Sequence, residues 1–227
     1  MSNIIELKDI SKSFIDNGSE LLLFKDVNLA IAKGESISIT GPSGSGKSTL
    51  LHIAATIETP TSGTLLINGK DVKSLSDDKK ALLRRNFSFM FQKNFLFPSW
   101  TVEENIMLPL LISSKKQDKN KKNDLLHRFN LESKLHTKAR YLSGGEKSRV
   151  SLIRAIMSDG VLVFADEPTG SLDRDNARIV EDELFSLVKD YNKSLLFVTH
   201  SEELSKRADK MYKIENKTLL KKGNTEC

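Results

Sequence analysis

The stretch from Gly41 to Thr49 constrains the fold of this chain more than any other part of the sequence. It reads Gly-Pro-Ser-Gly-Ser-Gly-Lys-Ser-Thr, follows an alternating apolar run that ends at Ile39, and leads directly into a helical pattern that begins at Leu50. A glycine, four further residues and then Gly-Lys-Ser, placed between a strand and a helix, is the spacing of a phosphate-binding loop, or P-loop. The sequence therefore predicts an α/β fold that binds a nucleoside triphosphate at this loop.

The residue types in the loop suit phosphate binding for separate physical reasons. Glycines have no Cβ and adopt positive φ readily, so the backbone can curl with successive N–H groups pointing inward. The start of the following helix adds unpaired N–H groups and partial positive charge. Lys47 is placed to reach the β- and γ-phosphates, and the hydroxyl of Ser48 suits Mg²⁺. The residues predicted to bind the phosphates are Gly41, Pro42, Ser43, Gly44, Ser45, Gly46, Lys47, Ser48 and Thr49.

Length, charge and cysteine content narrow the class of protein. The 227 residues are enough for one large α/β domain or for a domain with a smaller subdomain. The net charge of +5 is mild and the basic residues are not interleaved with aromatic residues, so no nucleic-acid partner is expected. No run approaches the ~18 consecutive apolar residues that span a bilayer, and the N-terminus lacks the pattern of a secretory signal. We therefore expect a protein of the cytoplasm, with the single cysteine, Cys227, as a solvated tail residue.

The densest basic cluster runs from Lys115 to Lys122. A solvated loop or helix start explains it, and contact with acidic lipid headgroups is the alternative.

The order of patterns along the chain predicts how the fold is organised. Alternating apolar residues between Ile5 and Ile31 indicate antiparallel strands that precede the P-loop. The apolar run Val161–Ala165 is typical of a central parallel strand that is covered on both faces. We therefore expect an α/β nucleotide-binding core, mainly a parallel sheet with an antiparallel β part, over residues 1–93 and 159–227. The mostly helical pattern between them predicts an inserted helical subdomain over about residues 94–158.

Polar residues at strand ends are candidates for chemistry on the nucleotide. Asp166 and Glu167 follow the apolar strand, at the edge where open α/β sheets place their ligands. Asp166 suits Mg²⁺, and Glu167 suits the orientation or deprotonation of an attacking water. Gln92 and His200 are single polar residues at the ends of other predicted strands, and each alone is more often structural than catalytic.

The segment Leu142–Glu146 reads Leu-Ser-Gly-Gly-Glu and predicts a helix start. Ser143 is the expected N-cap, and Gly144 and Gly145 would let an anion approach the N–H groups of the first turn closely. A helix cap without a ligand explains the same residues.

Taken in order, these motifs resemble those of the ATPase subunits of ATP-binding-cassette (ABC) transporters, and the resemblance covers essentially the whole chain. The motifs are the P-loop, Gln92, Leu142–Glu146, Asp166–Glu167, Ser171–Asp173 and His200. In that family an α/β core carries an antiparallel β subdomain and a helical subdomain, and two subunits sandwich two ATP molecules head to tail. The resemblance implies an ATPase that binds MgATP with a second copy. It also implies integral membrane permease subunits as partners and a peripheral location at the cytoplasmic face of the inner (plasma) membrane.

The resemblance also assigns roles by matching position. Glu167 would be the catalytic base, and His200 would contact the γ-phosphate. Gln92 would touch Mg²⁺ and report ATP occupancy to the membrane partner, and Asp173 would belong to the dimer contact. The residues that would contact the γ-phosphate of ATP held by the opposite subunit are Ser143, Gly144 and Gly145.

Phe14 stands where the family commonly has a tyrosine. From the residues alone, Phe14 is equally well a core residue or a ring that stacks on the base of the nucleotide. Stacking would survive the absence of the hydroxyl. Glu146 replaces a commoner glutamine, and neither change removes a catalytic group.

Within the family the chain is most similar to the subgroup of lipoprotein-release, macrolide-efflux-type and cell-division ATPases. The residues that carry this similarity are Pro60–Gly63, Leu82–Arg85, Phe97–Pro98, Thr101–Leu110 and Asp166–Asp173. Because these look most like the lipoprotein-releasing ATPases, we expect lipoprotein release, with macrolide or peptide efflux and cell division as alternatives. A soluble ABC ATPase that acts on DNA or ribosomes is an alternative of a different class. Such proteins usually have a long coiled-coil insertion or two cassettes in one chain, and neither pattern is present here.

An aromatic stretch with Phe95, Phe97 and Trp100 lies between Gln92 and the predicted helix at Val102. A packed core explains it, and the alternative is a binding hot spot, of which aromatic residues are frequent anchors. In the family that the chain resembles, this segment borders the groove that receives a cytoplasmic helix of the membrane subunit.

Overall fold

The computed structural model describes residues 3–16, 18–113 and 119–223. It contains two compact units, of which unit 1 comprises Met1–Arg84 with Lys193–Cys227 and unit 2 comprises Arg85–Asn192. Cys227 and the lysines at 115 and 116 lie outside the described residues, so the expectations for them stay predictions. Within the described ranges, the helices are too short or too polar to cross a bilayer.

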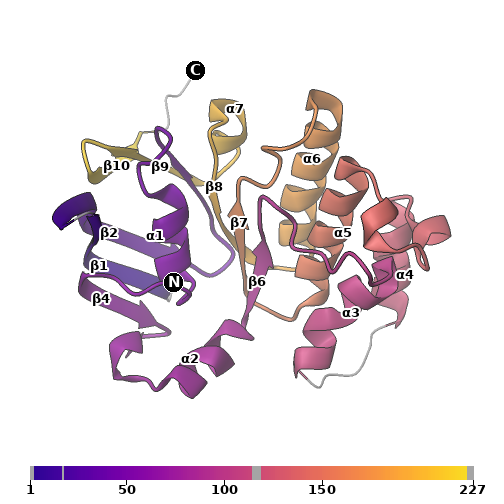
Figure 1. Ribbon diagram of the computed structural model, residues 1–227, viewed down its shortest axis with the longest axis horizontal. Coiled ribbons are helices and arrows are strands. Elements are labelled where there is room, and N and C mark those ends of the chain that lie inside the picture. The colour runs from indigo at the N-terminus through magenta and orange to yellow at the C-terminus, as the bar shows by residue number, and fades with distance from the viewer. Residues whose placement is uncertain (1–2, 17, 114–118, 224–227) are drawn as a thin grey trace. The chain divides into compact units, whose positions relative to one another are not determined.

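The antiparallel strands predicted before the P-loop form a sheet in unit 1 together with two strands that follow the P-loop, in the order β2-β1-β4-β5 (Figure 1). Its strands are β1 (Asn3–Asp16), β2 (Ser19–Ala32), β4 (Ser62–Ile67) and β5 (Lys70–Asp71). The alternation of Ile5, Leu7 and Ile10 places these side chains in the core, and all three are buried. Irregularities in the pairing of β1 with β2 interrupt the register, so the two long strands bend while staying paired.

Unit 1 also contains a group of parallel strands around β3 (Ser36–Thr40), which pairs in parallel with β8 (Ser194–Val198) and with β9 (Lys210–Glu215). The last strand, β10 (Thr218–Lys222), is antiparallel to β9. Every residue of β3 and β8 is buried, as expected for central parallel strands. The helices of the unit are α1 (Lys47–Ala54), α2 (Asp77–Arg84) and α7 (Glu202–Ser205), with a 3₁₀ turn at Val72–Ser74.

Unit 2 contains the parallel pair β6 (Phe87–Met90) and β7 (Leu162–Asp166) and most of the helices (Figure 1). The helices are α3 (Val102–Ser113), α4 (Lys119–Arg128), α5 (Gly144–Met157) and α6 (Arg174–Asp190), with 3₁₀ turns at Glu132–Lys134 and Ala139–Tyr141. Aromatic rings pack between the two strands: the centroid of the Phe164 ring lies 5.2 Å from that of Phe87 and 5.6 Å from that of Phe89.

The mixed α/β fold predicted from the sequence is confirmed in its parts: an antiparallel sheet, parallel strands around the P-loop, and helices α3 to α5 between β6 and β7. The sequence pattern also predicts a strand over Ser194–Val198, and β8 has these bounds. The pattern that follows predicts a short helix from Ser201 to Ala208, whereas α7 ends at Ser205.

Candidate active site

The P-loop connects the buried strand β3 to helix α1. Its last glycine, Gly46, is the N-cap of α1 and has left-handed backbone angles, with φ 89° and ψ 16°. A Cβ at Gly46 would lie 2.9 Å from a ring carbon of Phe24 on β2, so a side chain does not fit there. The antiparallel sheet therefore packs against the loop, and this contact as well as the positive φ requires glycine.

The loop surrounds the ammonium of Lys47. Lys47 is buried, and its Nζ donates to the carbonyl oxygens of Gly41 and Pro42, each at 3.0 Å. Ser43 and Gly44, at the turn of the loop, are exposed. A fixed positive charge beside an accessible loop at a helix start is an environment that suits phosphate groups.

His200 lies at the same edge of unit 1 as the P-loop. In the parallel pairing of β3 with β8, Ile39 is opposite Val198, and the P-loop and His200 follow these residues in their strands. The backbone N–H of Thr199 donates to the carbonyl of Ile39 at 3.1 Å, and His200 itself is exposed. The structure thus brings His200 and the P-loop together at the carboxyl ends of neighbouring strands, where α/β sheets bind ligands.

Phe14 lies on β1, opposite Leu21 of β2, and is 41% exposed. It is therefore not a core residue. The interpretation that remains is a ring available for stacking, on the strand pair whose Leu23 and Phe24 contact the P-loop.

In unit 2, Ser143 caps helix α5 as predicted. The Ser143 Oγ accepts from the backbone N–H of Glu146 at 3.2 Å, and the Glu146 carboxylate accepts from the N–H of Ser143 at 2.8 Å, which is a complete capping box. The hydrogen bond from the Ser143 N–H is the largest cause of the lowered pKa of Glu146. Ser143 and Gly144 are exposed, so the N-terminus of α5 faces solvent.

Gly145, unlike Ser143 and Gly144, is buried, because it packs against a side chain of the same chain. A Cβ there would lie 2.6 Å from Oδ1 of Asn176, which is on α6. The Asn176 amide is held in turn by Asp173, the N-cap of α6, whose carboxylate accepts from the Asn176 Nδ2 at 2.7 Å and from its backbone N–H at 3.0 Å. These bonds lower the pKa of Asp173, the backbone N–H of Asn176 being the largest cause. Asn176 thus connects the predicted dimer residue Asp173 to the Ser143–Gly145 segment, a role that the sequence analysis missed.

Glu167 and Gln92 lie near one another in unit 2. Glu167 follows the half-buried Asp166 at the end of β7, is 8% exposed and has a positive φ of 46°. The N–H of Gly170 donates to the Glu167 carbonyl at 3.1 Å and closes a turn. A Cβ built on Gly170 would lie 3.4 Å from the Glu167 Cβ and 3.6 Å from the Gln92 Nε2, so both side chains border the same small space. Positive φ is unfavourable for a non-glycine residue, so the surrounding fold holds the backbone of Glu167 in this conformation.

Two buried polar side chains hold the segment that follows Gln92, and the sequence analysis identified neither. Arg154 of α5 donates to the carbonyls of Asn94 at 2.6 Å and Phe95 at 2.8 Å, and burial lowers the pKa of its guanidinium. Asn105 of α3 is fully buried, accepts from the Phe97 N–H at 2.8 Å and donates back to the Phe97 carbonyl at 3.2 Å. The sequence signal that could have identified them is a polar side chain within an apolar helical stretch.

These bonds hold an aromatic surface formed by Phe95, Phe97 and Trp100. Phe95 is 60% and Phe97 45% exposed, and the rings of Phe97 and Trp100 stack with centroids 4.5 Å apart. Trp100 is half-buried. The fold of unit 2 thus holds this aromatic surface in place while leaving it exposed to solvent.

The site residues predicted from the sequence thus fall into two groups. Unit 1 holds Phe14, the P-loop and His200; unit 2 holds Gln92, Ser143–Gly145, Asp166 and Glu167.

Comparison with known proteins identifies the family to which the chain belongs. The family model described as ABC transporter matches residues 24–170, which is more than half of the chain. The chain belongs to the ABC transporter family and is an ATPase of that family, which binds and hydrolyses ATP.

Individual relatives support this assignment over nearly the whole chain. The chain is 42% identical over 223 residues to the lipoprotein-releasing system ATP-binding protein LolD of Ehrlichia ruminantium (strain Gardel), covering 96% of this chain and 97% of that protein. It is 38% identical over 220 residues to the macrolide export ATP-binding/permease protein MacB of Campylobacter fetus subsp. fetus (strain 82-40), covering 96% of this chain and 34% of that protein. Among solved structures, the dimeric post-hydrolysis state of the ATP-binding cassette MJ0796 bound to ADP and Pi is 29% identical with a TM-score of 0.88, covering 98% of this chain and 100% of that chain. The predicted family and fold are confirmed.

Proposed function

We propose that this chain is the ATP-hydrolysing subunit of a membrane transporter that releases lipoproteins, and that it acts as a head-to-tail homodimer on integral permease subunits. The observation that carries the proposal is the 42% identity, over 96% of the chain, to a protein named for a lipoprotein-releasing system. The proposed location is the cytoplasmic face of the inner membrane. In the proposed single ATPase domain, residues 1–93 and 159–227 form the nucleotide-binding core and about 94–158 the helical subdomain.

The phosphates of ATP are proposed to lie on the loop Gly41–Thr49. The buried ammonium of Lys47 and the N–H groups at the start of α1 supply the positive charge and the donors that this requires. Phe14, which is 41% exposed, is proposed to stack on the adenine. His200, at the end of β8, is proposed to donate a hydrogen bond to the γ-phosphate.

Ser48, Gln92 and Asp166 are proposed to hold Mg²⁺. A hydroxyl, a side-chain amide and a carboxylate offer the oxygen ligands that this ion prefers, so the residue types fit. When bound, the ion neutralises negative charge on the phosphate oxygens.

Glu167 is proposed as the general base. Its carboxylate would accept a proton from the water that attacks the γ-phosphorus, while the bond from that phosphorus to the leaving oxygen of ADP breaks. The closed turn to Gly170 and the burial of Glu167 support this role, because they restrict where the carboxylate can lie.

Ser143, Gly144 and Gly145 are proposed to contact the γ-phosphate bound by the second copy. The exposed start of α5 supports this, since its N–H groups and partial positive charge are accessible to an anion from another molecule.

The catalytic part of the proposal is tested with Glu167→Gln. We expect ATP binding close to that of the wild type, ATP hydrolysis slower by a factor on the order of 10² or more, and a dimer that persists with ATP. Nucleotide affinity, phosphate release and size-exclusion elution are measured on one preparation. Hydrolysis at the wild-type rate would exclude Glu167 as the base.

The transported substrate is tested separately. The Glu167→Gln chain is used to capture its membrane partner in mild detergent, and the partner is then combined with the wild-type chain in liposomes that contain an acylated lipoprotein. We expect ATP-dependent release of the lipoprotein, and none with Glu167→Gln. ATP hydrolysis that is stimulated by a macrolide, with no lipoprotein released, would favour macrolide export, the function in the name of the MacB relative.

A further inference from the structure

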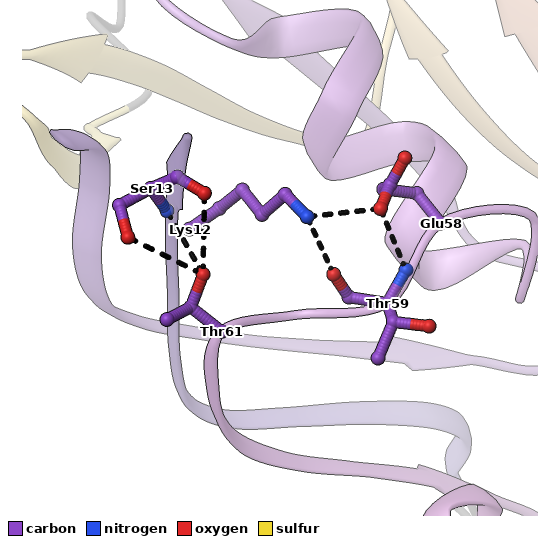
Figure 2. A network of polar contacts seen from close by, with 5 residues as sticks. All are labelled: Lys12, Ser13, Glu58, Thr59 and Thr61. Atoms are coloured by element: carbon purple, nitrogen blue, oxygen red, sulfur yellow. Dashed lines mark hydrogen bonds and ion pairs between the residues drawn. The ribbon is translucent and has the colours of Figure 1, made fainter. Parts of the chain in front are cut away.

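Lys12 of β1 is a buried lysine, with 8% of its surface exposed. Figure 2 shows its side chain extending from the strand toward Glu58 and Thr59. Its Nζ donates to the Glu58 Oε1 and to the Thr59 carbonyl, each at 2.9 Å, and the bond from Lys12 is the largest cause of the lowered pKa of Glu58. Because a buried charge is unfavourable unless it is paired, these two acceptors fix where the ammonium lies.

The same ammonium lies over the ring of Phe14. Nζ is 4.6 Å from the ring centroid, within the range of an attractive cation–π contact. Lys12 and Phe14 are two positions apart on a strand, so their side chains share one face of it. Phe14 nevertheless remains 41% exposed, so the ring contacts Lys12 while part of its surface stays accessible to a planar ligand.

Further bonds connect this part of β1 to the segment that follows the P-loop helix. The backbone N–H of Ser13 donates to the Thr61 Oγ1 at 3.0 Å, and the N–H of Thr61 donates to the Ser11 carbonyl at 2.9 Å (Figure 2 draws the Ser13–Thr61 pair). The N–H of Glu58 donates to the carbonyl of His52 in α1 at 3.2 Å. The partner that holds Lys12 is thus anchored to the helix that begins at the P-loop.

We propose that Lys12 is a positioning residue for recognition of the nucleotide base: held by Glu58 and Thr59, it sets the orientation of the Phe14 ring on which adenine stacks. This inference rests on the proposed ATP site. Phe14 has no hydroxyl to anchor its ring, so the ammonium supplies the directional contact. A ring oriented beforehand loses less conformational entropy when a base binds. An ammonium over one face also draws π-electron density from the ring, which reduces repulsion between the ring and an electron-rich purine.

The test separates base recognition from phosphate recognition. ADP and inorganic pyrophosphate share the diphosphate, but only ADP carries adenosine, and neither is hydrolysed during calorimetric titration. For Lys12→Met we expect ADP to bind about three- to tenfold more weakly, because the ring must then be ordered when the base binds, and pyrophosphate to bind as to the wild type. Glu58→Gln, which keeps the lysine but weakens its hold, should give a smaller loss with the same preference for ADP.

A double-variant cycle assigns the effect to the ring. In a Phe14→Ala background, Lys12→Met should change ADP affinity less than about 1.5-fold, because the group that it positions is gone. Lys12→Arg, which keeps a cation over the ring, should restore most of the affinity. The matched control is Lys8→Met: Lys8 lies on the same strand and pairs with Glu6 at 3.3 Å, and its loss should leave the binding of both ligands unchanged.

Two results would overturn the inference while the ATP site stands: equal weakening of ADP and pyrophosphate by Lys12→Met, or the same loss with and without Phe14. Unchanged ADP affinity in Phe14→Ala alone would remove base stacking from the proposed function, and the role of Lys12 with it. Unfolding midpoints of each variant, measured in the absence of ligand, show whether a loss of affinity comes from a loss of folded protein.

Discussion

Gly145→Ala tests whether the Ser143–Gly145 segment needs its buried glycine for packing within one chain. The new Cβ would lie 2.6 Å from Oδ1 and 2.9 Å from Cγ of Asn176. The amide cannot turn away without losing its 2.7 Å bond to Asp173. Overpacking of this kind costs roughly 1–3 kcal/mol, against which the helix gains roughly 0.5–1 kcal/mol from replacing a glycine. We therefore expect Gly145→Ala to lower the free energy of unfolding by about 1 kcal/mol, the difference between the middle values of these two ranges.

In an Asn176→Ala background, Gly145→Ala should no longer lower the free energy of unfolding. The Cβ of residue 176 lies 3.5 Å from the Cβ built on Gly145, which is an ordinary contact, so both alanines fit together. In this background Gly145→Ala should be neutral or stabilising by up to about 0.5–1 kcal/mol. Gly144→Ala is the matched control, because a Cβ at Gly144 would meet its nearest neighbour, Cδ2 of Leu172, only at 4.0 Å.

Urea unfolding followed by circular dichroism, on the wild type, both single variants and the double variant, measures these free energies. An equal loss from Gly145→Ala in the two backgrounds would refute the assignment to Asn176. ATPase activity of the double variant, compared with that of Asn176→Ala alone, tests the proposed contact of Gly145 with the nucleotide. If Asn176→Ala is active and the double variant is stable but inactive, the glycine is also needed at the nucleotide.

Three further predictions concern neighbouring parts of the molecule. Arg154→Met should lower the free energy of unfolding in urea by about 3 kcal/mol, because a buried carbonyl and a partly buried one lose a charged donor. Arg178→Met on the exposed face of α6 should change it by less than about 0.5 kcal/mol, and similar values for both would contradict the role of Arg154. Glu146→Gln should lower the free energy of unfolding by about 0.5–1 kcal/mol at neutral pH. Because the pKa of Glu146 is lowered in the folded state, this difference in stability between wild type and variant should shrink as the pH falls below the ordinary value of 4.5; a difference that is constant from pH 7 to acid would show that the charge of Glu146 does not contribute. Trp100→Ala should leave nucleotide affinity unchanged but weaken binding of the membrane partner by about 2 kcal/mol, since the ring stacks on exposed Phe97. Unchanged recovery of the partner in a pull-down would place the docking surface elsewhere.

Local sequence patterns were enough to predict features whose physical reasons are local. Gly46 has the positive φ that its place before α1 predicted, and Ser143 caps α5. The five residues of β8 form a strand with the expected bounds, because an apolar run of this length suits a strand that is covered on both faces. Helix ends were less well predicted: α7 stops at Ser205, whose Oγ lies 2.7 Å from the Ser38 Oγ of β3, a contact that no local pattern encodes.

The tertiary structure decided which polar groups meet across long sequence separations. Lys12 meets a carboxylate 46 residues away, and Arg154 meets a carbonyl 59 residues away. Phe14 illustrates the same limit, because its sequence context left burial and stacking equally open until the pairing of β1 with β2 placed it at the surface. Apolar periodicity in the sequence predicts which face of a helix or strand is buried, but it does not predict which other element covers that face. The partner of a buried charge is selected by the packing of whole elements, and it is therefore known only once the chain has folded.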